Sequence, residues 1–252
     1  MPQPKPRVLS MIYFRVRLRF RKRDDIRWIS HHDLVRTFER WLRRAGLPLR
    51  RSEGFHPKPK LSFPSALALG IAALDEVLEF ELTEPLELVE LRRRLERTAL
   101  PGLEAAEILS VSRADAKPQI QRVTYELPIP PAYGPRLVEQ IAQLQAVSAY
   151  WFQRVGADEP ADLKASLDQL EFHDGKLRFC LAVGQPRCAR PREVLEALGV
   201  AQLESAGCCL TRTRVELAVR PHNSNEERRN KSHEEGNADQ CVATGGMPDC
   251  DR

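Results

Sequence analysis

Residues 12–21 read Ile-Tyr-Phe-Arg-Val-Arg-Leu-Arg-Phe-Arg, so apolar side chains alternate with arginines over most of the stretch. Successive side chains of a β-strand point to opposite faces of a sheet, and a period of two therefore indicates a half-buried strand. We predict such a strand here. One of its faces packs on a core, and the other face carries four arginines.

An amphipathic helix is predicted directly after this strand. Ser30 can accept a hydrogen bond from a helical N–H, and Asp33 lies three residues later, as in a capping box. Apolar residues then recur on one helical face and arginines on the opposite face, until Gly46 and Pro48 end the pattern. The apolar face holds Leu34, Phe38, Trp41, Leu42 and Ala45, and the cationic face holds Arg36, Arg40, Arg43 and Arg44.

The remaining pattern predicts an α+β protein built from tandem ferredoxin-like (β-α-β-β-α-β) units. In the first half, strands are expected over residues 61–70, 77–83 and 103–112, and a helix over 87–100. In the second half, strands are expected over 123–127, 170–172, 177–183 and 210–219, and helices over 135–150, 162–170 and 191–198. These units correspond to a basic domain over 12–113 and a second domain over 121–220. Residues 221–252 are too polar to form a core and are predicted to be a disordered tail.

The composition of the 252-residue chain excludes several classes of protein. No run approaches the roughly 18 apolar residues of a membrane-spanning helix, and the start lacks the long apolar core of a signal peptide. We therefore expect a cytoplasmic protein that has no membrane partner. The six cysteines form neither a C-x-x-C pair nor the triplet that binds an iron–sulfur cluster. The sequence predicts no cofactor and no metal site in this chain.

Positive charge is concentrated at one end of the chain. The first 60 residues hold 17 Lys and Arg against 5 Asp and Glu, a local net charge of +12, whereas the whole chain carries only +4. Association with a polyanion depends on where positive charge gathers. Nucleic acid is therefore the first partner class to consider, and an acidic protein surface is the second.

The loop over residues 52–60 is the strongest candidate for ligand binding, because prolines stiffen a segment that carries both an aromatic ring and cations. Gly54 allows close approach of the backbone, and His56 follows Phe55. Phe55 can stack on a base, while Lys58 and Lys60 can contact phosphates. Alternatively, this is a rigid surface loop that Phe55 anchors to the core. Exposure of the Phe55 ring separates the two interpretations.

The strand arginines also allow more than one interpretation. Arg15, Arg17 and Arg19 either form an open, polyanion-binding sheet face or pair with Glu79 and Glu81 of a neighbouring strand. A third alternative places them in an interface with the second half. The three alternatives stay open on the sequence alone.

His31 and His32 lie in the first turn of the predicted helix, where the helix dipole disfavours a cation and lowers a histidine pKa. A neutral imidazole can act as a general base, for example on an RNA 2′-hydroxyl. The alternative is a structural helix start that packs against the following loop. A metal site formed with His56 is not predicted, because the spacing does not support one.

Two motifs resemble a known family: Ser-His-His-Asp-Leu-Val-Arg at residues 30–36 and Ser-Glu-Gly-Phe-His-Pro-Lys-Pro-Lys-Leu-Ser at 52–62. Together with Arg-Ala-Gly-Leu-Pro at 44–48, Gly70 and the strand at 79–82, they resemble the bacterial radical SAM-linked protein family (domain of unknown function 2344) over about residues 12–220. The resemblance implies a working relation with a radical SAM enzyme and an RNA-related role. Since this chain lacks the cluster-binding triplet, that enzyme would be a separate chain.

We therefore expect a non-catalytic RNA-binding or substrate-presenting accessory protein that acts with a separate radical SAM enzyme. One alternative is a metal-independent RNA-processing enzyme that uses His31 or His32 as its base. The other is a protein-interaction module that docks an acidic partner. The expected nucleic-acid contacts are Arg15, Arg17, Arg19, Arg36, Arg40, Arg43, Phe55, Lys58 and Lys60, in a loop shaped by Gly54 and His56.

Overall fold

The structure is a computed structural model that describes residues 12–154, 156, 159–184 and 187–218. The predicted disordered tail, residues 221–252, lies outside the described residues. The first half contains β1 (Phe14–Lys22), α1 (His31–Arg44), β2 (Leu61–Ser62), β3 (Ala72–Leu82), α2 (Leu88–Arg97) and β4 (Leu103–Val111). The second half contains β5 (Ile120–Pro128), α3 (Gly134–Ala146), β6 (Trp151–Phe152), β7 (Ala161–Asp162), β8 (Leu167–His173), β9 (Lys176–Ala182), α4 (Pro191–Ala197), α5 (Gln202–Ser205) and β10 (Thr211–Leu217). The predicted α+β class is confirmed.

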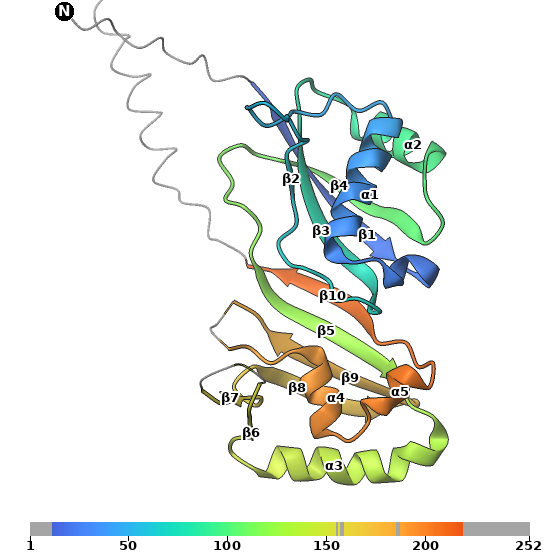
Figure 1. Cartoon of the computed structure of the whole chain (residues 1–252), viewed down its shortest axis with the longest axis vertical. Helices are drawn as coiled ribbons and strands as arrows, with labels where there is room; N and C mark the ends of the chain where they lie inside the picture. The colour runs from blue at the N-terminus through green and yellow to red at the C-terminus, as the bar shows by residue number, and fades with distance from the viewer. Residues whose placement is uncertain (1–11, 155, 157–158, 185–186, 219–252) are drawn as a thin grey trace, which may run out of the picture. The chain divides into compact units, whose positions relative to one another are not determined.

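One mostly antiparallel sheet runs through both halves in the strand order β4-β1-β3-β10-β5-β9-β8, with β2 paired to β3 off this path (Figure 1). Seven of its strands form the path, and β6 and β7 form a separate small pair. The two halves meet where β10 pairs with β3 in parallel, through only two residue pairs. No helix in the described part of the chain is long and apolar enough to cross a membrane.

The alternation of residues 12–21 produces the central strand of the first half. Val16, Leu18 and Phe20 are buried in one core, while the arginines of β1 lie on the opposite face of the sheet. β1 pairs antiparallel with β3 on one side and with β4 on the other. A strand with neighbours on both sides has its backbone groups satisfied, and here its arginines lie beside the acidic residues of both neighbours.

α1 begins and ends where its capping residues predict. The Ser30 hydroxyl accepts a hydrogen bond from the Asp33 N–H at 3.1 Å and donates one to the Asp33 carboxylate at 2.7 Å. Gly46 has φ +65°, a left-handed conformation that costs glycine little and stops the helix. The apolar face of α1 is buried, and the Trp41 indole N–H donates to the Leu95 carbonyl at 3.2 Å.

Two predicted elements are wrong. The strand expected over 61–70 is only Leu61–Ser62, because Pro64 has no N–H to donate to a ladder. The helix expected over 162–170 is replaced by β7 and the start of β8. The Asp162 carboxylate accepts hydrogen bonds from the N–H groups of Tyr150 and Lys164, which fixes a turn rather than a helix.

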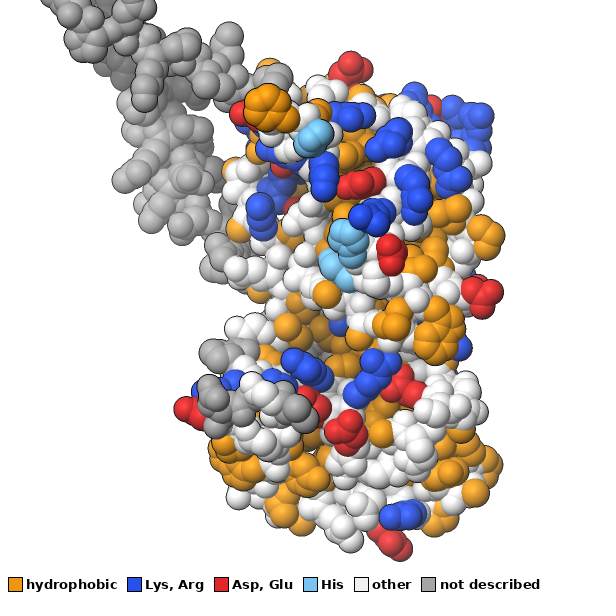
Figure 2. Space-filling model, viewed as in Figure 1, with side chains coloured by type: hydrophobic (Ala, Val, Ile, Leu, Met, Phe, Trp, Pro, Cys, Tyr) orange, Lys and Arg blue, Asp and Glu red, His pale blue; other side chains and the backbone are white. Residues whose placement is uncertain are grey.

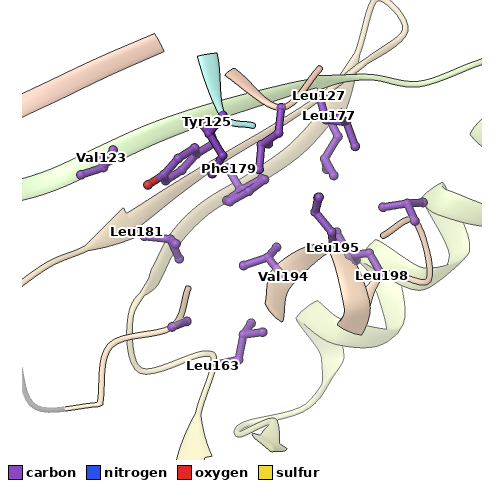
Figure 3. Packing of buried hydrophobic residues seen from close by; sticks show 14 of the residues in the cluster. Val123, Tyr125, Leu127, Leu163, Leu177, Phe179, Leu181, Val194, Leu195 and Leu198 are labelled. Atoms are coloured by element: carbon purple, nitrogen blue, oxygen red, sulfur yellow. The ribbon is translucent and has the colours of Figure 1, made fainter. Parts of the chain in front are cut away.

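The second half has its own core between the sheet and its helices. Val123, Tyr125 and Leu127 of β5 pack with residues of β9 and α4 (Figure 3). The partners labelled in the figure are Leu163, Leu177, Phe179, Leu181, Val194, Leu195 and Leu198. Every second residue from Val123 to Leu127 lies in this core, as a strand that is covered on one face requires.

A buried polar network joins the two halves at β10. The Arg212 guanidinium donates to the Glu76 carboxylate of β3 at 2.6 Å and to the Tyr125 hydroxyl of β5 at 2.8 Å. Burial raises the pKa of the Glu76 carboxyl, and Arg212 opposes that rise. The Val215 N–H also donates to Asp75 at 2.8 Å. These bonds add polar links where the strand pairing itself is short.

Lys22 lies at the end of β1 with 0% of its surface exposed. Its ammonium donates to the carbonyls of Arg27 and Ile29 at 3.2 and 3.3 Å. Burial lowers the pKa of Lys22 from 10.5 to about 8, and the Glu76 carboxylate partly offsets this fall. The charged form of Lys22 is therefore disfavoured in the folded protein relative to the unfolded chain.

Replacement of Lys22 by Met, which does not titrate, should change how stability depends on pH. The pKa of Lys22 is about 8 in the folded protein and about 10.5 in the unfolded chain, so the unfolded chain binds more protons between these values. The free energy of unfolding of the wild-type protein, relative to Lys22→Met, should therefore rise by about 3 kcal/mol over this interval. Urea unfolding of both proteins across the interval measures it. A pH-independent difference would contradict the assignment.

Candidate nucleic-acid interface

The arginines of β1 are engaged in ion pairs within the sheet. Arg15 and Arg17 both bind the Glu79 carboxylate, at 2.7 and 2.8 Å, and Arg19 binds Asp75 at 2.6 Å. Arg15 is only 8% exposed. The alternative of paired arginines therefore describes this face, although Glu81, which was expected to take part, binds Arg50 at 2.7 Å instead. A phosphate would have to displace a carboxylate to reach these guanidinium groups.

The arginines of α1 are in a different state. Arg36, Arg40 and Arg43 are exposed, and none of them forms an ion pair with any described residue. Arg40 and Arg43 line a shallow groove of about 490 Å³ together with Arg44, Thr37 and Leu100. Figure 2 shows Lys and Arg side chains gathered on the part of this face that carries α1, with His side chains among them. This helical face keeps its positive charge available to a ligand.

Residues 50–60, which we call the hairpin, follow α1 and are held by local hydrogen bonds. The Ser52 N–H donates to the Lys58 carbonyl at 2.8 Å, and the Lys58 N–H donates to the Ser52 hydroxyl at 3.1 Å. The Lys60 N–H donates to the Arg50 carbonyl at 2.9 Å. Gly54 at the tip has φ +119°, which residues with a side chain rarely adopt. The tip is therefore shaped by its own backbone.

The hairpin presents its aromatic ring to solvent. Phe55 is 102% exposed, and His56 and Lys58 beside it are also exposed. The anchor interpretation of Phe55 requires a buried ring and is therefore wrong. Lys60 is half-buried at the base of the hairpin, where it lines a second groove. Phe55 and Lys58 are thus available to a ligand that lies against α1 and the hairpin.

The two adjacent histidines have different surroundings. The ring of His31 lies edge-on to Phe63 with centroids 5.4 Å apart, and its Nδ1 atom is buried without a hydrogen-bond partner in the described chain. Burial lowers the pKa of His31, and Lys22 and His32 lower it further. His32 is exposed. No group of three or more potential ligands in the described residues could hold a metal ion, and the set His31, His32 and His56 is therefore not a metal site there.

The sequence analysis missed one cationic cluster. The guanidinium groups of Arg50 and Arg113 both lie over the ring of Tyr13, which directly precedes β1, at 4.2 and 4.3 Å from its centroid. Lys117 lines the same groove as Arg113. The sequence signal for this cluster is that Tyr13 falls in the alternating pattern on the same side as the arginines of β1. Arg113 is the last residue of the first predicted domain, and Lys117 lies in the segment between the two predicted domains.

Comparison with known proteins gives one match to a family. A family model described as "Uncharacterized protein conserved in bacteria (DUF2344)" matches residues 15–191. The crystal structure of an unknown protein from Galdieria sulphuraria is 14% identical over 82% of this chain and 100% of that chain, with a TM-score of 0.25. At that TM-score the likeness carries no argument about the fold. A search of curated proteins finds no match.

Replacement of Phe55 by Ala should leave the fold intact, because the ring makes no buried contact. We expect the melting temperature to change by no more than about 2 °C, as is usual for a surface substitution. Phe38→Ala is the matched control, since that ring is fully buried against Phe20 and Trp41, and its loss should cost about 3–5 kcal/mol. Thermal unfolding followed by circular dichroism measures both. A large loss of stability in Phe55→Ala would show that the ring packs on the protein.

Proposed function

Since the chain belongs to the DUF2344 family of uncharacterized bacterial proteins, we propose that it binds single-stranded RNA as a non-catalytic accessory protein. In this role it presents RNA or another substrate to a separate radical SAM enzyme in the cytoplasm. The main support is the contrast between two sets of arginines. Arg15, Arg17 and Arg19 of β1 are each paired with a carboxylate, whereas Arg36, Arg40 and Arg43 of α1 have no carboxylate partner in the described part of the chain.

The ligand class follows from the chemistry of the two exposed elements. The guanidinium groups of α1 suit phosphate oxygens, which supply most of the affinity of proteins for nucleic acids. The exposed Phe55 ring suits the flat face of a base. A base offers its face to a side chain only when it is not stacked within a duplex, so the combination favours a single strand. Lys58 beside Phe55 adds a further phosphate contact.

The order of the strands supports a finer description of the fold. The first half has the chain order β-α-β-β-α-β, and the second half has the same order when the separate β6–β7 pair is set aside and α4 and α5 count as one helical segment. The first half has the strand order β4-β1-β3-β2, and the second half has β10-β5-β9-β8. Numbered within its own half, each is 4-1-3-2, and we propose that each half is a ferredoxin-like unit. Other RNA-binding sheets use their open face. Here the β1 arginines are paired on that face, so we assign RNA to the helix side.

The radical SAM partner is supported by the sequence resemblance alone. The motifs at 30–36 and 52–62 include Arg36 of α1 and Phe55 and Lys58 of the hairpin, so part of the proposed RNA surface lies within the residues that carry the resemblance. The six cysteines lack the triplet that holds an iron–sulfur cluster. Any radical SAM chemistry would therefore take place on another chain.

A second candidate function is RNA processing with His31 as a general base. It is favoured by the lowered pKa of His31, which leaves a neutral imidazole at neutral pH. His31→Ala separates the two functions, because an enzyme would lose turnover and keep RNA binding. A third candidate, docking of an acidic protein, would use the same α1 arginines and would show no RNA binding.

The salt dependence of RNA binding tests the leading proposal. Each phosphate neutralised on a single strand contributes about −0.7 to the slope of log K against log salt. The triple variant Arg36→Gln, Arg40→Gln, Arg43→Gln should therefore flatten the slope by about 2, whereas Phe55→Ala should weaken binding by about 1–3 kcal/mol at an unchanged slope. Fluorescence anisotropy with a labelled oligonucleotide that has no terminal phosphate measures both quantities.

A charge-matched control distinguishes a site from general attraction. Arg136, Lys176 and Arg214 are exposed on the second half, and their replacement by Gln removes the same charge as the α1 variant. We expect this control to bind RNA with nearly the wild-type slope. Equal flattening in both variants, or no binding by the wild-type protein at low salt, would refute the proposed interface.

A further inference from the structure

A second groove, with a volume of about 470 Å³, lies where the base of the hairpin meets the segment after β4. We call it the β1-end groove, because Tyr13 and Arg15 at the start of β1 form part of its wall. The side chains of Lys60, Arg113 and Lys117 also line it. Arg15 faces away from the core that α1 covers, so this groove is distinct from the α1 surface.

Apart from Arg15, the groove has three cationic side chains, and none of them has an anionic partner among the described residues. Among the described residues, the side chains of Lys60, Arg113 and Lys117 form no hydrogen bond and no ion pair. They come from two segments that are far apart in the sequence. Cations that converge on one concavity without a carboxylate partner are arranged as an anion-binding site requires.

Arg113 is oriented by stacking rather than by a hydrogen bond. Its guanidinium lies 4.3 Å from the centroid of the Tyr13 ring, and Arg50 lies 4.2 Å from the same centroid. Arg50 is in turn bound to Glu81 at 2.7 Å. The stack holds the Arg113 plane while its N–H donors stay available to a ligand.

Arg15 holds the segment that carries two of these cations. Its guanidinium donates to the carbonyls of Ser112 and Asp115, and to the Glu79 carboxylate at 2.7 Å. The Ser112 hydroxyl also accepts the Ala114 N–H at 3.2 Å. The turn over residues 112–115 is therefore tied to a buried ion pair, and it places Arg113 and Lys117 in advance of any ligand.

The carboxylates of the groove do not cancel its positive charge. Glu79 is paired with Arg15 and Arg17, and Glu81 is paired with Arg50. The Asp115 carboxylate accepts the neutral Ser112 N–H and keeps its charge, so one negative charge faces the three cations of Lys60, Arg113 and Lys117. The rest of the wall consists of Ser62 and of apolar or aromatic side chains that include Pro59, Leu61 and Phe80. A cavity of this volume holds far more than a single phosphate group, and its combination of cations and an apolar wall is typical of sites for small organic ligands.

We propose that the β1-end groove binds a mononucleotide, with its phosphate on Lys60, Arg113 and Lys117 and its base against the apolar wall. The phosphate would provide the negatively charged partner that these three side chains do not have within the described chain. The base supplies a flat apolar body of the size that the remaining space accepts. This inference does not depend on RNA binding at α1, because none of Arg36, Arg40, Arg43, Phe55 and Lys58 lines the groove.

Isothermal titration calorimetry tests this site with 5′-AMP, 5′-GMP, 5′-CMP and 5′-UMP, each titrated singly into the full chain. We expect at least one of them to bind, and inorganic phosphate to compete with it. The matching nucleoside, which lacks the phosphate, should bind at least about tenfold more weakly. No binding by any of the four, or equal binding of nucleoside and nucleotide, would overturn the proposal.

Variants locate the binding. A triple variant should bind the nucleotide about tenfold more weakly or worse, because three charged contacts are lost. It carries Lys60→Gln, Arg113→Gln and Lys117→Gln. If the triple variant does not fold, the double variant Lys60→Gln, Lys117→Gln takes its place, because it leaves the stack of Arg113 on Tyr13 intact. It should lose less nucleotide affinity than the triple variant would. Arg36→Gln, Arg40→Gln, Arg43→Gln is the matched control and should bind the nucleotide like the wild-type protein. Unchanged affinity in a folded groove variant would overturn the assignment.

Discussion

Glu79 of β3 binds two arginines of β1 at once, and most of the charge distribution of the first half depends on this arrangement. Removal of one partner from a buried ion pair costs about 3–5 kcal/mol, since it leaves a charge without compensation. The pairing engages Arg15 and Arg17, while Asp75 and Glu104 engage Arg19 and Arg21 of the same strand. It also anchors Arg15, which holds the turn at 112–115. The available cations that the proposals use lie on α1, on the hairpin and in the β1-end groove.

The second half depends on another buried pair. β10 joins β3 through two residue pairs only, and the Arg212–Glu76–Tyr125 network lies at that joint. Each group of the network is buried, so each needs the others to offset the loss of water. In both places, strands that belong to different parts of the chain are matched by charge as well as by backbone hydrogen bonds. The sheet positions the proposed RNA surface and the β1-end groove but contributes few of their exposed cations.

Local pattern predicted most elements, because their signals lie within a few neighbouring residues. The alternation at 12–21 gave β1, and the Ser30 cap with the spaced apolar residues gave α1. The turn held by Asp162 was missed, although its bond from the Lys164 N–H is local, because the bond from the Tyr150 N–H joins residues 12 positions apart. The exposure of Phe55 and the partners of Arg15 were left undecided, because both depend on tertiary contacts. The β1-end groove was missed for the same reason, since it brings together residues 13, 60 and 113–117.

The central claim is that α1 and the hairpin form the RNA-binding surface, whereas the arginine face of β1 does not. Photo-crosslinking of a single-stranded RNA that contains 4-thiouridine, followed by mass spectrometry of the linked peptides, tests this claim most directly. Crosslinks should map to the hairpin around Phe55 and to peptides of α1 between His31 and Arg44. Crosslinks confined to the strands of the sheet, or to the second half, would contradict it.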